Sequence, residues 1–153
     1  MKKEIRPKIV TLFGVLEIIF SVLGLIFSVI GVLAIFLFTG MSNTMYADIN
    51  VPTGYFILSF FIVLPLLIVR LISAINLLKL KDWARRTLIV VAIINIAYGI
   101  IDFNIQKYLF FVQVQITPFY VLLAVLRYVY IGLLIYFLTS HEVKKAFISH
   151  PSK

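Results

Sequence analysis

Ionisable side chains lie within stretches of this sequence that are otherwise apolar enough for a lipid bilayer. Glu17, Arg70 and Arg127 each stand in a different stretch, and Asn95 and Asp102 stand together in a further one. A charge at mid-bilayer costs about 2.5–3.5 kcal/mol on insertion scales, so such residues are expected to face the protein interior and to pair. A carboxylate among guanidinium groups predicts a buried ion pair, and the excess of arginine favours an anion over a cation as any ligand.

The helical rise predicts that these side chains occupy one layer. At 1.5 Å per residue, Glu17, Arg70, Asn95 and Arg127 lie about 10 to 17 Å from the cytoplasmic ends of their spans. We expect Glu17 between the two arginines in a polar cluster inside a helical bundle. Asp102 lies nearer the outside on the Asn95 face, from which it could share Arg127. The expected hydrogen-bond partners of the cluster are Ser73, Asn76 and Asn95.

Two interpretations of this cluster stay open. In the first, it marks a substrate or proton path or a binding site, because intramembrane ionisable residues often line such sites. In the second, it is a buried ion pair that determines which helix packs on which.

Small residues form a stripe along the first apolar stretch. Spacings of 3, 4, 3, 4 and 3 place its members on one face of a helix. Lipid provides no hydrophobic drive between helices, so close packing selects small residues. The stripe is therefore the expected helix-packing seam, and it puts the glutamate on the buried face. Its members are Gly14, Glu17, Ser21, Gly24, Ser28 and Gly31.

Long apolar segments must position these residues. Of the 153 residues, 63% are hydrophobic, which is more than a soluble domain of this size can cover, so membrane insertion is the expected class. The pattern predicts an all-α fold, with residues 1–153 forming a single transmembrane bundle of four helices. The predicted spans cover about 9–38, 55–80, 83–103 and 118–138.

The basic residues gather on one side of these spans. They precede the first span, lie between the second and third and follow the last, whereas Lys107 is the only one in an outer connection. This positive-inside pattern predicts that both termini are cytoplasmic and that the protein is a multi-pass protein of the cell (inner or plasma) membrane. The formal charge of +8 is then a topology signal, with the lipid bilayer rather than nucleic acid as the partner.

The connections between the spans differ in character. Residues 39–54 are polar and predict an outer loop, and residues 79–86 predict a short inner turn with Trp83 as an interfacial anchor. Residues 104–117 favour a loop lying on the outer interface. Their first half could instead extend the third helix, and their glutamines could line a vestibule. The tail from Ser140 predicts either a short helix on the inner surface or a frayed end of the fourth span.

The sequence offers little for catalysis. The only histidines, His141 and His150, lie in the tail, and there is no cysteine. No metal-ligand spacing, Gly-rich phosphate loop or nucleophile with a plausible base lies in or near the spans. We therefore predict a protein without enzymatic activity, cofactor or bound metal.

Two short motifs carry a family resemblance. The stretch LLKLKDWARR (residues 77–86) after the second span and HEVKKAF (residues 141–147) after the fourth resemble small uncharacterised prokaryotic four-span membrane proteins. In that family a Leu-Lys-x-Trp-Ala-Arg turn and a Pro-Glu-Val-Lys-x-x-Phe tail recur, and His141 stands here in place of the proline. The resemblance implies the fold and the membrane location, but no activity. Small multidrug transporters share the four spans and an early glutamate, but Arg70 and Arg127 would harm a cation path.

Two functions from different classes fit these observations. The sequence favours a non-enzymatic integral membrane protein that acts as an assembly partner, regulator or accessory subunit. It would pack its helix faces against another membrane protein or a second copy of itself. The competing hypothesis is a small transporter or an anion- or lipid-headgroup-binding protein that uses Glu17, Arg70 and Arg127.

Overall fold

The computed structural model describes residues 8–45, 53–109 and 118–148, and these residues form helices without any strand. The helices are α1 (Lys8–Met45), α2 (Thr53–Leu78), α3 (Asp82–Leu109), α4 (Pro118–Thr139) and α5 (His141–Ile148).

Four of these helices are long and apolar enough to cross a membrane, as judged by length and composition. The prediction of an all-helical chain with four spans is confirmed at this level, and it indicates a multi-pass integral membrane protein. The segments that meet the criterion are Lys8–Ala34, Ile57–Leu78, Asp82–Ile105 and Val121–Thr139.

Two helices extend beyond the predicted spans. The first span was expected to end near residue 38, but α1 continues to Met45 through a polar segment, and α3 continues to Leu109 instead of ending near residue 103. A helix ends where its backbone hydrogen bonds end, and polar residues can extend it beyond the apolar region. The alternative in which the third helix is extended is therefore the correct one for residues 104–109, and residues 110–117 lie outside the described residues.

The turn between α2 and α3 is closed by backbone hydrogen bonds. Lys81 N–H donates to Asn76 O at 3.1 Å and Leu80 N–H donates to Leu77 O at 2.9 Å, which is the pattern of a Schellman motif. Leu80 occupies the left-handed position with a φ of 54°, where glycine is usual. The Leu80 side chain is buried, so its apolar contacts offset the conformational cost.

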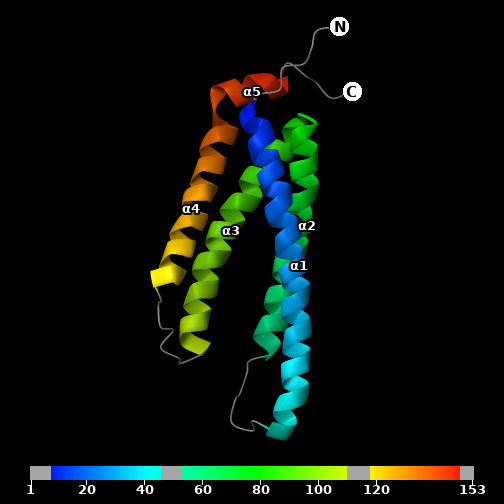
Figure 1. The fold of residues 1–153 in the computed structure, drawn as a ribbon. Helices are drawn as coiled ribbons and strands as arrows, with labels where there is room; N and C mark the ends of the chain where they lie inside the picture. Colours follow the sequence, from blue (N-terminus) through cyan, green and yellow to red (C-terminus); the bar gives the residue numbers. More distant parts are fainter. Residues whose placement is uncertain (1–7, 46–52, 110–117, 149–153) are drawn as a thin grey trace.

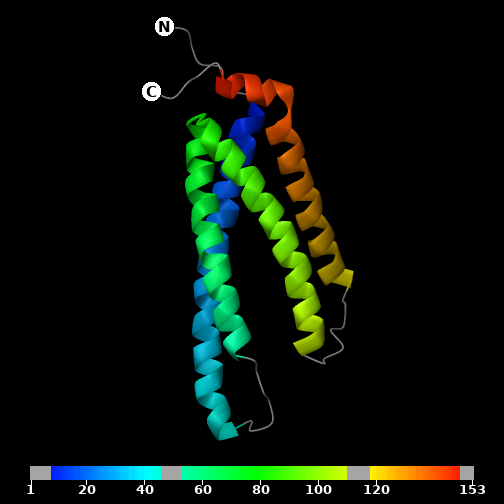
Figure 2. The same ribbon diagram turned by 180° about the vertical axis from the view of Figure 1, so that it is seen from behind.

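The helices form two pairs that separate with distance from α5. α1 and α2 lie side by side, and α3 and α4 lie together on the other side of the molecule (Figure 1). Seen from behind, the two pairs again diverge away from the end where α5 crosses the bundle (Figure 2). α1 begins at that same end.

The hydrophobic core lies at the α5 end of the bundle. Val10 and Phe13 of α1, Leu77 of α2, Leu88 of α3 and Leu134 of α4 belong to one cluster of buried side chains. Farther from α5 the pairs diverge, and the polar residues of the spans lie just outward of this core.

The tail is a separate helix that packs on the core. α5 begins at His141, directly after Ser140, and its Val143 and Phe147 side chains are each only 2% exposed within the core cluster. Of the two alternatives for the tail, the short helix is therefore correct. Its apolar residues are covered by the protein's own spans, and Trp83 at the start of α3 stays 47% exposed.

Candidate functional site

Glu17 and Arg70 form an ion pair between α1 and α2. Arg70 Nη2 donates to Glu17 Oε1 at 2.8 Å, and Arg70 Nε donates to the other carboxylate oxygen, Oε2. The Glu17 side chain is fully buried, and that of Arg70 is 16% exposed. This bidentate contact is the geometry in which a guanidinium binds a carboxylate most specifically.

Tyr130 of α4 completes the coordination of the carboxylate. Its hydroxyl donates to Glu17 Oε1 at 2.6 Å, a length typical of a hydrogen bond to a charged oxygen. Toward the hydrophobic core, the space beside Glu17 and Arg70 measures only about 10 Å³, which is at the lower limit for one water molecule. The buried Glu17 carboxylate therefore joins α1 to α2 and α4 through hydrogen bonds.

Tyr130 is not among the residues predicted from the sequence, although its depth along α4 matches that of Glu17 along α1. Tyr130 lies nine residues from the C-terminal end of α4 and Glu17 nine from the N-terminal end of α1, so both stand about 14 Å from those ends. Arg127 lies one turn farther out on α4, at about 18 Å.

Arg127 contacts Asn95 instead of Glu17. Arg127 Nη2 donates to Asn95 Oδ1, so the partner is a neutral amide on α3. The expectation that Glu17 lies between both arginines is therefore wrong, because only Arg70 reaches it. Gly99 allows this close approach of α4: a Cβ at Gly99 would lie 3.0 Å from Tyr128 Oη and 3.7 Å from Arg127 Nη2.

Ser73 and Asn76 are not hydrogen-bonded to the ion pair. Ser73 is buried, but its hydroxyl has no hydrogen-bond partner among the described residues, and Asn76 Nδ2 donates to Ile72 O in its own helix at 2.8 Å. Neither residue is therefore the expected partner of the ion pair. Asp102 is half-buried on α3, farther from the start of the helix than Asn95.

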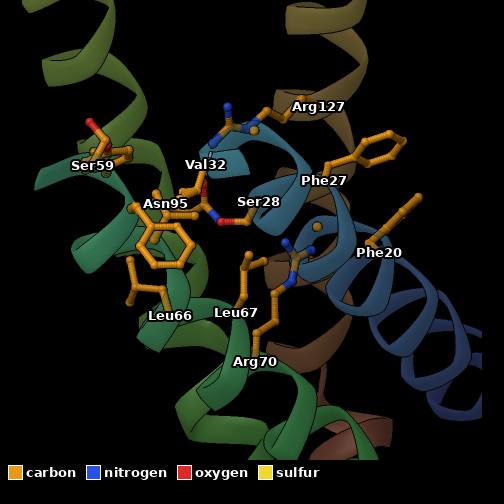
Figure 3. A pocket seen from close by; sticks show the side chains of 15 residues that line it. Phe20, Phe27, Ser28, Val32, Ser59, Leu66, Leu67, Arg70, Asn95 and Arg127 are labelled. Carbon is orange, nitrogen blue, oxygen red and sulfur yellow. Dashed lines mark hydrogen bonds between the residues drawn. The ribbon is translucent and has the colours of Figure 1, made fainter. Parts of the chain in front are cut away.

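An open cavity of about 550 Å³ lies outward of the ion pair, between the two pairs of helices. We call it the arginine cavity, because Arg70 and Arg127 both line it and both extend toward it in Figure 3. Further polar side chains in its lining are Ser28, Ser59, Asn95 and Tyr98, and the remaining lining is apolar or glycine: Phe20, Gly24, Phe27, Gly31, Val32, Phe60, Val63, Leu66 and Leu67. None of the described residues that line it is acidic.

The small-residue seam lies in two different environments along α1. At Gly14 an added Cβ would lie 2.4 Å from Leu78 Cδ2, and at Gly24 it would lie 2.9 Å from Leu67 Cδ2, so α2 packs closely there. At Gly31 the same Cβ would lie more than 4 Å from every atom of the described residues. The predicted packing face therefore holds for the inner part, including the buried Ser21, and is wrong for Gly31. There, as at Ser28, the stripe lines the arginine cavity.

Comparison with known proteins gives no match. No family model, no curated protein and no solved structure resembles the chain closely enough to assign it. The family resemblance of the two short motifs therefore stays a prediction. Among the residues that the structure describes, no group of three or more His, Cys, Asp and Glu side chains is placed to hold a metal ion.

Proposed function

We propose that this chain is a non-enzymatic, multi-pass membrane protein that binds an anionic group in the arginine cavity. The group is either a lipid headgroup or a free anion, since both offer the same charged oxygens. The observation that carries the proposal is Arg127, which faces the cavity with the neutral Asn95 as its partner. A guanidinium deep in a span is costly without a compensating charge, and it binds phosphate or carboxylate through parallel N–H bonds.

The two arginines have different roles in this proposal. Arg70 is held by the buried carboxylate of Glu17, which supports a structural role in holding α1, α2 and α4 together. Arg127 is exposed and lies on the cavity wall, which supports a role in binding. The geometry therefore favours anion binding over the assembly hypothesis, in which the helix faces alone would carry the function.

We expect Arg127→Met to weaken the retention of an anionic lipid about tenfold to a hundredfold. The reason is that a hydrogen bond to a charged group contributes about 1.5–3 kcal/mol. The measurement is native mass spectrometry of the protein in a non-ionic detergent, titrated with phosphatidylglycerol or with phosphatidylcholine. Arg86→Met is the matched control, because Arg86 is an exposed arginine at the inner end of α3, away from the cavity.

Several outcomes separate the alternatives. Displacement of phosphatidylglycerol by inorganic phosphate would show that a free anion suffices, and resistance to it would favour the headgroup. Equal retention of both lipids, unchanged in Arg127→Met, would contradict the proposal. A second protein chain that is bound in place of lipid and lost with Arg127→Met would support the accessory-subunit hypothesis instead.

Both termini are proposed to be cytoplasmic, because the basic residues gather at the inner ends of the spans. The start of α1 and α5 at one end of the bundle supports the shared side (Figure 1). In this cysteine-free chain, a membrane-impermeant maleimide should label Ser42→Cys in intact cells and Ser152→Cys only after permeabilisation. Labelling of both from the same side would overturn the topology.

A further inference from the structure

The arginine cavity is much longer than a free anion needs. Its wall on α1 runs from Phe20 to Val32 and its wall on α2 from Ser59 to Arg70, which correspond to lengths of about 18 and 17 Å along the helices. Its volume of about 550 Å³ lies in the range of about 300–1,000 Å³ typical of pockets for organic ligands. A site of this shape fits an elongated molecule aligned with the helices.

The polarity of the lining changes along this length. Residue counts from the inner ends of the helices place Arg70 and Arg127 at depths of about 12 and 18 Å, and Phe27 and Ser59 at about 29 Å. Beyond the arginines the lining is mostly aromatic and aliphatic, with the hydroxyls of Ser28, Ser59 and Tyr98 as exceptions. The cavity therefore has a cationic inner end and an apolar outer part.

We propose that the arginine cavity holds one single-chain anionic amphiphile, with its charged end between Arg70 and Arg127 and its hydrocarbon chain along α1 and α2. This inference rests on the proposed function, because it assigns the ligand class of the same site. The charged end supplies a counter-charge to Arg127, whose partner is a neutral amide, and the chain covers the apolar wall, which a free anion would leave uncovered.

The cavity is open on one side. Phe20 and Phe27, which stand at one side of the cavity in Figure 3, are 42% and 66% exposed. In a membrane that side faces the bilayer, so a lipid chain has a direct route to the apolar wall.

The ligand class is tested with three probes that differ in one part each. Lysophosphatidylglycerol has the anionic head and one chain. Lysophosphatidylcholine has the same chain on a zwitterionic head, and glycerol phosphate has the charge without the chain. We expect a single lysophosphatidylglycerol to bind in native mass spectrometry, at least tenfold more tightly than either other probe. Each buried methylene group contributes up to about fourfold in affinity, so only part of a chain needs to be covered.

Gly31→Leu tests the position of the chain. Gly31 lines the cavity and has open space around it, and Gly132 on α4 has equally open space but does not line the cavity. We expect Gly31→Leu to weaken lysophosphatidylglycerol binding at least fivefold and Gly132→Leu to leave it unchanged. Thermal unfolding of both variants checks that the fold is retained.

The outcomes distinguish the failure of this inference from the failure of the proposed function. If glycerol phosphate binds as tightly as lysophosphatidylglycerol, the chain has no role and only the anion site stands. If lysophosphatidylcholine binds as tightly as lysophosphatidylglycerol and Arg127→Met changes neither affinity, both the anion site and the amphiphile site are wrong. If Gly31→Leu does not fold, the comparison of the three probes on the unaltered protein decides the matter alone.

Discussion

Replacing Glu17 with glutamine is expected to lower the free energy of unfolding by about 3–5 kcal/mol, the usual cost of removing one partner from a buried ion pair. Glu17 is fully buried and accepts two hydrogen bonds from Arg70 and one from Tyr130. An amide has one oxygen to accept these bonds, and its NH₂ group would face the guanidinium donors. Arg70 would keep its charge without a counter-charge.

The measurement is thermal or denaturant unfolding of the purified protein in a mild detergent. Glu17→Gln combined with Arg70→Met is expected to recover part of the loss, because removing both partners of a buried pair is far less costly than removing one. Tyr130→Phe removes one hydrogen bond to a charged group and is expected to cost about 1.5–3 kcal/mol.

Arg127→Met is the control for this prediction, since its guanidinium contacts Asn95. A double-mutant cycle should give strong coupling between Glu17 and Arg70 and weak coupling between Glu17 and Arg127. If Glu17→Gln leaves the stability unchanged and neither arginine couples to it, Glu17 is not an ionised partner. It would then be protonated, as a hydrogen-bond donor within the seam.

The contact between Glu17 and Arg70 is the part of the site that is easiest to predict from the sequence. A carboxylate and a guanidinium in apolar stretches have a strong reason to meet, and the helical rise puts both at similar depth. The estimated depths wrongly placed Arg127 in the same layer as Glu17, because Arg127 lies one turn farther along its helix than Glu17 and Arg70. Tyr130, which does contact the carboxylate, could not be identified from the sequence, because a tyrosine in a membrane span does not require a charged partner.

The arginine cavity could not be predicted, because it depends on how far the helices diverge. The spacing of the small residues correctly places Gly14 and Gly24 against α2. The same spacing continues to Gly31, yet no atom of the described residues lies within 4 Å of a Cβ built there. Periodicity identifies the face of a helix, but the distance to the next helix is set by side chains elsewhere in the bundle.

Arg85 joins α3, α4 and α5 at the α5 end of the bundle, and its loss is expected to release α5. It is only 8% exposed, and its Nε donates to Asp82 Oδ1 at 2.9 Å. Its Nη1 donates to Leu138 O at 3.0 Å, one of the last carbonyls of α4, which generally lack a partner within their own helix. Its guanidinium carbon lies 5.9 Å from the ring centroid of Phe147, within the range of a cation–π contact.

Arg85→Met is therefore expected to lower the free energy of unfolding by about 2–3 kcal/mol, because it removes charged hydrogen bonds and leaves a buried carbonyl unpaired. Arg86→Met removes the same charge from the same Asp82, but the pair is exposed, and such pairs contribute about 0–1 kcal/mol. Hydrogen exchange should accelerate in residues 141–148 for Arg85→Met alone. Equal effects of the two substitutions would show that the burial of Val143 and Phe147 holds α5 without Arg85.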